Sequence, residues 1–128
     1  MRRREFIAVI AAGVGMVRAT LVGAMQRTPV VPAVDPELEA FSKHNLEVAR
    51  LYFKKKAWKG VANRLEEVAA TYPEFTKIDE VYYLLGVSYI KLEKIDDARD
   101  ILKKLIDVRP DSDYAKKART ELADLDKP

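Results

Sequence analysis

Apolar residues recur three or four positions apart from Pro36 to the end of the chain, a spacing that places them on one face of a helix. The pattern predicts five helices, over residues 38–52, 58–72, 81–92, 95–106 and 112–125. Pro73 and Pro110 end the second and the fourth helix, because proline cannot continue a helix. No stretch alternates as a strand does, so we expect residues 37–126 to form an all-α domain.

The predicted helices repeat at a fixed offset. Four pairs of residues lie 37 positions apart: Ala49 and Gly86, Tyr52 and Tyr89, Leu65 and Leu102, and Pro73 and Pro110. This offset indicates two copies of one helix–turn–helix unit, which must stack because such a unit cannot bury its own apolar face. We expect the fifth helix to cover the second unit and to be capped by Ser112 or Asp111.

Two positions of the repeat, each present in both units, allow a prediction about steric constraints. Gly86 and Ala49 fall where the two helices of a unit cross, and a small side chain lets the backbones approach. Lys56 and Glu93 fall in the turns between paired helices, where a glycine would suit a positive φ. A left-handed conformation there would cost about 0.5–1 kcal/mol, and the alternative is a turn of another geometry.

The second unit resembles the tetratricopeptide repeat. It reads Tyr82-x2-Leu85-Gly86-x2-Tyr89, then Ala98-x3-Leu102, then Pro110, and these offsets match that family's signature. The first unit follows the same register with Asn45, Val48, Ala49, Tyr52, Val61, Leu65 and Pro73. The resemblance implies an α-α superhelix of about two repeats followed by a C-terminal capping helix.

In this family the first helix of each unit lines a concave groove that receives a protein partner. The resemblance places eight residues in that groove: Lys43, Leu46, Arg50, Phe53, Glu80, Tyr83, Val87 and Ile90. We expect the apolar members to lie outside the core, with Phe53 and Tyr83 in one surface, and Arg50 to hold a carboxylate with its two-pronged guanidinium. The alternative is that N-terminal residues or a neighbouring subunit cover this face.

Residues 44–73 resemble the first repeats of BamD-like proteins, which are lipoproteins of the outer-membrane β-barrel assembly machinery. The matching residues are His44, Val48-Ala49-Arg50, Tyr52, Lys54-Lys55-Lys56, Trp58 and Asn63-Arg64-Leu65. Residues 109–115 resemble a repeat junction of BamD and of the periplasmic coordinator of the Tol–Pal system. The chain differs in having no cysteine to carry a lipid and fewer repeats. We therefore expect an adaptor or accessory subunit of a membrane-associated complex, with outer-membrane assembly as the alternative.

Residues 1–24 have the pattern of an export or anchoring segment. Three arginines follow Met1, and the 12 residues from Phe6 to Val17 are apolar or glycine, as in a signal peptide. Arg3-Arg4 also fits a twin-arginine signal, while residues 6–25 are long enough to remain as a membrane span. Each alternative leaves a periplasmic or otherwise extracytoplasmic protein. Residues 25–36 contain three prolines and predict an extended tether.

Charge and composition further limit the partners, cofactors and catalytic residues that we expect. The net charge of +3 belongs to residues 1–24, since residues 25–128 hold 19 basic and 19 acidic residues, so we expect no nucleic-acid partner. Without cysteine and with His44 as the one histidine, we expect no metal, no cofactor and no catalytic residues. The sequence thus predicts a non-enzymatic binding protein with protein partners and a membrane contact through residues 1–25.

Overall fold

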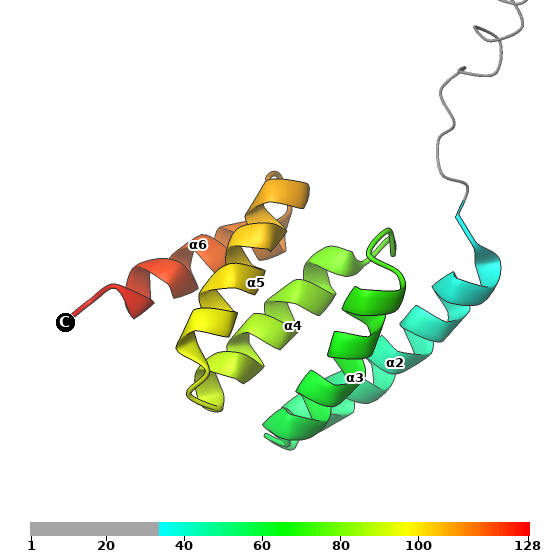
Figure 1. Cartoon of the computed structure of the whole chain (residues 1–128), viewed down its shortest axis with the longest axis horizontal. Helices are drawn as coiled ribbons and strands as arrows, with labels where there is room; N and C mark the ends of the chain where they lie inside the picture. The colour runs from blue at the N-terminus through cyan, green and yellow to red at the C-terminus, as the bar shows by residue number, and fades with distance from the viewer. Residues whose placement is uncertain (1–33) are drawn as a thin grey trace, which may run out of the picture. The chain divides into compact units, whose positions relative to one another are not determined.

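Five helices follow one another in an up-and-down array (Figure 1). The structure is a computed structural model, and it describes residues 34–128. The helices are α2 (Pro36–Lys54), α3 (Trp58–Thr71), α4 (Ile78–Lys91), α5 (Ile95–Val108) and α6 (Asp113–Leu125). The all-α prediction and the five helices are confirmed. The predicted signal or anchor and most of the tether fall in residues 1–33, outside the described part of the chain.

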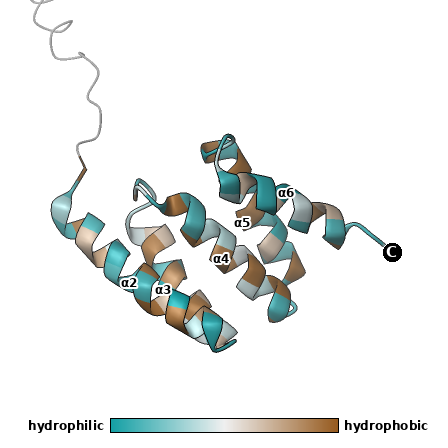
Figure 2. Ribbon diagram, turned by 180° about the vertical axis from the view of Figure 1, so that it is seen from behind, coloured by the Kyte–Doolittle hydropathy of each residue, from teal (hydrophilic) through white to brown (hydrophobic). Residues whose placement is uncertain are grey.

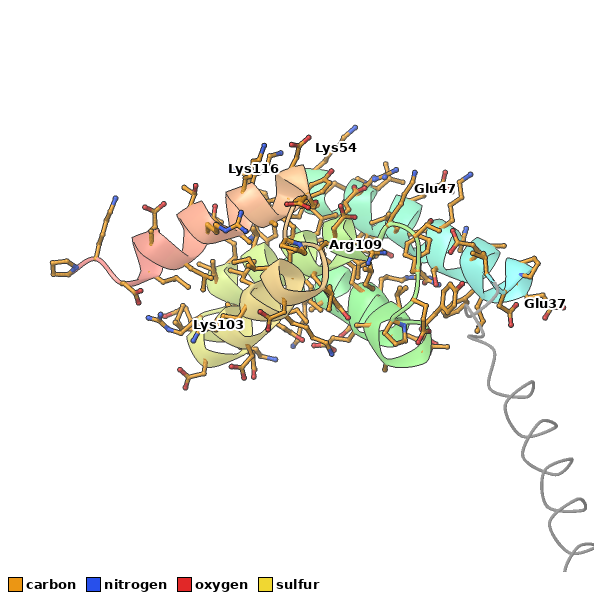
Figure 3. All side chains as sticks on the ribbon, turned by 90° about the horizontal axis from the view of Figure 1, so that it is seen from above. Glu37, Glu47, Lys54, Lys103, Arg109 and Lys116 are labelled. Carbon is orange, nitrogen blue, oxygen red and sulfur yellow. The ribbon has the colours of Figure 1, made fainter. Side chains whose placement is uncertain are left out.

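The helices form two layers. Consecutive helices pack against each other, and α4 in addition contacts α2 and α6. The first helices α2, α4 and α6 therefore form one layer, and the second helices α3 and α5 form the other. In Figure 3, Lys54 and Lys116 lie along one edge of the molecule and Lys103 lies on the opposite side. No helix in residues 34–128 combines the length and the hydropathy that crossing a membrane requires.

One continuous core runs between the two layers. Figure 2 shows hydrophobic residues along α3, α4 and α5, whereas α6 is mostly hydrophilic. Within residues 34–128 no further helix covers the outer side of α6, which agrees with its polar composition. The fully buried side chains come from all five helices and the α3–α4 connection, and include Leu46, Val61, Leu65, Phe75, Tyr82, Leu85, Leu102, Leu105 and Ala118.

The crossing of α4 and α5 is too close for any side chain at Gly86. A Cβ atom built there would lie 2.5 Å from Leu102 Cδ2 and 2.7 Å from its Cγ, well inside van der Waals contact. In the first unit the equivalent Ala49 is fully buried and its methyl group is accommodated. The predicted small-residue crossing is confirmed, and it is tighter in the second unit than in the first.

Both turns within a unit adopt the left-handed conformation. Lys56 has φ 59° and Glu93 has φ 62°, and no other non-glycine residue in the described range has a positive φ. The hydrogen bonds also match, since the N–H groups of Ala57 and Lys94 each donate to a tyrosine carbonyl, Tyr52 or Tyr89, at 2.8 Å. The turn therefore takes the geometry that glycine would favour, which decides between the two alternatives drawn from the sequence.

Side-chain hydrogen bonds link the residues that follow a unit's second helix to segments earlier in the chain. The hydroxyl of Tyr72 accepts a hydrogen bond from the Asp35 N–H at 3.2 Å, and Arg109 donates to the Phe75 carbonyl at 3.4 Å. Ser112 caps α6 by accepting from the Tyr114 N–H at 3.0 Å and donates its own hydroxyl proton to the Asp79 carboxylate, 2.6 Å away. Of the two residues predicted to cap α6, Ser112 performs this role.

We expect Gly86→Ala to destabilise the domain by about 1–3 kcal/mol, because the new methyl group overlaps Leu102. In an exposed helix the same substitution would stabilise by up to about 1 kcal/mol. The sign of the change in the free energy of unfolding therefore shows whether position 86 is sterically crowded. Denaturant unfolding of Gly86→Ala, Leu102→Ala and the double variant provides the measurement. Alanine at 86 should cost much less once Leu102 is truncated. An equal cost in both backgrounds would contradict the crossing geometry.

We expect Glu93→Gly to raise the free energy of unfolding by about 0.5–1 kcal/mol, because glycine adopts a positive φ without a steric penalty. Lys103→Gly is the matched control, at an exposed position inside α5. There glycine should destabilise by about 1 kcal/mol. Thermal unfolding should shift in opposite directions for the two variants, and a loss of stability in both would speak against the left-handed turn.

Candidate functional site

The predicted groove residues lie on α2 and α4, in the layer of first helices. We call the sides of α2, α4 and α6 that turn away from α3 and α5 the first-helix surface. Lys43 is exposed at this layer, and Val87 and Ile90 are half-buried. The remaining predicted residues differ strongly in their surroundings.

The structure corrects the prediction made for Leu46. Its side chain is 1% exposed and belongs to the core cluster, so the expectation that it lies outside the core is wrong. Leu46 and Arg50 are four residues apart and share one side of α2. Since Arg50 reaches across to α4, this side of α2 faces its neighbouring helix rather than solvent.

Arg50 and Glu80, both predicted groove residues, bind each other. Arg50 Nε donates to Glu80 Oε2 at 2.6 Å, and Arg50 Nη2 donates to Glu80 Oε1 at 2.6 Å. The two side chains are 41% and 12% exposed. This hydrogen bonding to Glu80 raises the pKa of Arg50. The carboxylate expected for Arg50 is thus supplied within the chain, and a partner's carboxylate would have to compete with Glu80.

Tyr83 packs on α6 instead of facing solvent freely. Its ring centroid lies 5.6 Å from that of Tyr114, with the planes inclined by 41°. The ammonium group of Lys117 sits 5.8 Å from the Tyr83 centroid and 5.2 Å from the Tyr114 centroid, within cation–π range of both rings. We call Tyr83, Tyr114 and Lys117 the tyrosine–lysine cluster.

The sequence analysis missed Tyr114 and Lys117 because it treated α6 only as a cap. A signal for Lys117 was present, since it lies 37 residues after Glu80, a predicted groove position. Tyr114 carries no comparable signal, because its packing against Tyr83 depends on how α6 returns across α4.

Phe53 belongs to a different cluster from Tyr83. Its ring meets Trp58 of α3 edge-on, with centroids 5.1 Å apart and planes at 82°. The aromatic contact of Tyr83 is with α6. The single apolar surface expected from Phe53 and Tyr83 is therefore divided into one aromatic pair at the α2–α3 turn and one at α6.

Burial raises the pKa of both clustered tyrosines. Desolvation is the main cause that raises the pKa of Tyr83, followed by the charge of Glu121. Desolvation likewise raises the pKa of Tyr114, with Glu80 adding to the effect. Both phenols therefore keep their protons at neutral pH and can donate hydrogen bonds. The surface presents aromatic faces, hydroxyl donors, one ammonium group and a neutralised ion pair, which together suit the binding of a polypeptide.

Comparison with known proteins agrees with this architecture. The family described as outer membrane lipoprotein (YfiO) matches residues 37–92, and the tetratricopeptide repeat family matches residues 80–112. The outer membrane protein assembly factor BamD of Haemophilus influenzae is 33% identical over 90 residues, which cover 70% of this chain and 34% of that protein. The match thus spans about a third of the length of BamD. No solved structure matches the chain. The chain is thus similar to BamD and contains a tetratricopeptide repeat, as the sequence motifs predict.

We expect Arg50 and Glu80 to be energetically coupled by about 0.5–1 kcal/mol, because the pair is bidentate and partly desolvated. A double-mutant cycle of Arg50→Ala and Glu80→Ala, read by denaturant unfolding, measures this coupling. The control is the pair Arg99 and Asp126, whose charged groups are similarly close, at 2.5 Å, but with Asp126 69% exposed. A coupling no larger than that of the control would mean that the Arg50–Glu80 pair does not fix the spacing of α2 and α4.

Proposed function

We propose that this BamD-like domain is a non-enzymatic docking module that binds a protein partner of an envelope complex outside the cytoplasmic membrane. The observation that carries the proposal is the way the three first helices are bridged at their common surface. Arg50 and Glu80 join α2 to α4, and the tyrosine–lysine cluster joins α4 to α6. A partner would therefore meet side chains that are already held in place.

Such preorganisation favours binding. Interfaces lose affinity when flexible side chains must be ordered, and the packing of Lys117 over two rings lowers that cost. Tyrosine and arginine are also the residue types that most often dominate binding energy, with losses of about 2 kcal/mol or more on truncation. We assign the contact to Lys43, Arg50, Glu80, Tyr83, Val87 and Ile90 of the predicted set, together with Tyr114 and Lys117.

The assignment to binding rather than catalysis rests on the chemistry of the surface. Among the residues assigned to the contact, the carboxylate of Glu80 is paired with Arg50, and burial raises the pKa of Tyr83 and of Tyr114. Neither arrangement supplies an activated nucleophile or a general base. The described residues also contain no group of three or more potential metal-ligating side chains.

The setting is proposed from the relatives and from the N-terminal sequence. The outer membrane lipoprotein family and BamD, an outer membrane protein assembly factor by name, both point to the cell envelope. Residues 1–24, with their arginine cluster and apolar run, fit export or anchoring. A role in outer-membrane protein assembly is the second candidate, favoured by the 33% identity over 90 residues.

Site-specific crosslinking in membranes of the native organism tests the docking surface. A photoreactive phenylalanine analogue replaces Lys117 in one version of the full chain and Lys103 in another. Figure 3 places Lys103 on the side of the molecule opposite Lys54 and Lys116. We expect a defined protein adduct from position 117 and none from position 103. Adducts from position 103 alone would contradict the proposal.

A pair of tyrosine variants then measures the contribution of the surface. Tyr83→Ala should lower the adduct yield at position 117 by about tenfold, because it removes an aromatic anchor. Tyr89→Ala is the matched control, since Tyr89 is also half-buried on α4 but donates its hydroxyl proton to Glu66 of α3. Circular dichroism verifies that both variants remain helical. Equal yields from both would argue against Tyr83 as a contact.

A further inference from the structure

The turn between α2 and α3 concentrates positive charge at one end of the domain. Its sequence places Lys54, Lys55, Lys56 and Lys59 around Trp58, and all four lysines are exposed. Lys91 of α4 adds a fifth ammonium group, 5.9 Å from the centroid of the Trp58 ring. Figure 1 shows why α4 contributes here, because the α2–α3 and α4–α5 turns lie at the same end of the helices. We call these six residues and Leu51 the basic turn surface.

The charge of this surface is not neutralised within the described residues. The salt bridges of residues 34–128 use Arg50, Arg99, Lys116 and Lys127 as their cations. The five lysines around Trp58 take part in none of them. The equivalent turn of the second unit differs, since residues 91–97 mix Lys91 and Lys94 with Glu93, Asp96 and Asp97. The excess of positive charge is thus specific to the first turn.

Lys59 departs from the usual charge pattern of a helix start, whereas Lys54 at the end of α2 follows the helix dipole. Acidic residues favour the first turn of a helix because of its dipole, and α2, α4, α5 and α6 each have at least one there. Helix α3 has none and has Lys59 as its second residue. The positive charge at this position is therefore not explained by the helix dipole of α3.

Exposed apolar groups accompany the lysines. Leu51 is 57% exposed and lies on the same side of α2 as Lys55, four residues later. Trp58 is half-buried, with its ring held edge-on against Phe53. Tryptophan together with lysine is typical of the boundary between a membrane and water, where the ring enters the headgroup region and the ammonium groups meet phosphates.

We propose that the basic turn surface docks the domain onto a membrane that contains anionic phospholipid. A lipid surface suits these side chains better than an acidic protein does, because lysines act as mobile point charges and lack the fixed fork that arginine offers to a carboxylate. Within the described part of the chain none of the five lysines is held in a defined ion pair, so the surface matches a diffuse array of charges. This contact is separate from the one predicted for residues 1–25 and from the first-helix surface.

Trp58 makes the proposal directly measurable, since it is the single tryptophan of the chain. The full chain is mixed with vesicles of phosphatidylcholine containing 30% phosphatidylglycerol, or with phosphatidylcholine alone, and brominated lipids in each quench nearby tryptophan. An apolar N-terminal segment that binds both vesicle types does not disturb the readout, because the quenching reports on the turn itself. We expect strong quenching on the anionic vesicles, little on the neutral ones, and loss of quenching in 0.5 M salt.

Two variants with equal charge removal complete the test. Changing Lys54, Lys55, Lys56 and Lys59 to glutamine should abolish the quenching on anionic vesicles, since each lysine near such a surface contributes about fivefold to binding. The control changes Lys77, Lys103, Lys116 and Lys127 to glutamine, and it should be quenched as the wild type is. Trp58 that stays unquenched in the wild type would overturn the proposal and favour an acidic protein as the occupant. Equal quenching of the two variants, or of wild type on both vesicle types, would overturn it as well.

Discussion

The close approach of α4 and α5 is the constraint on which the rest of the domain depends. With no side chain at Gly86, the backbone of α4 lies directly against Leu102. Helix α4 also contacts α2, α3 and α6, so its position sets where every other helix can lie. The distance between first helices then allows Arg50 to reach Glu80 on one side of α4 and Tyr83 to reach Tyr114 on the other. The candidate binding surface is therefore built around α4, whose packing against α5 is constrained at Gly86.

The repeat is built from local devices that recur at the same offset. Lys56 and Glu93 hold the same left-handed turn although neither is glycine, which means that the surrounding packing imposes the conformation on both. Tyr72 and Arg109, 37 residues apart, each send a side chain back to the preceding junction. Each link joins the residue that follows a unit's second helix to the segment just before that unit's first helix, so it closes the unit.

Periodicity in the sequence was sufficient to predict the helices, the crossing residue and the turns, because all three follow from short-range patterns that occur twice in the chain. The register alone could not identify what each groove residue contacts. Glu80 is 30 residues from Arg50, and their pairing depends on the spacing of two helices that belong to different units. Leu46 illustrates the same limit, since its burial comes from the side of α2 that faces α4. Continuing the 37-residue offset into the last helix would have found Lys117.

The two proposed surfaces use positive charge in opposite ways, and the difference follows from their places in the array. Arg50 sits between units, where its guanidinium group is bound in a bidentate pair by the largely buried carboxylate of Glu80. Leu51 and Ser88 are 37 residues apart, yet Leu51 is exposed and Ser88 is fully buried, because α4 follows another unit and α2 has none before it in residues 34–128. In the first unit, the lysines of the basic turn surface stay hydrated and need no partner inside the protein. Their charge is therefore available to an external anion, whereas the charge of Arg50 is already used to hold the helices together.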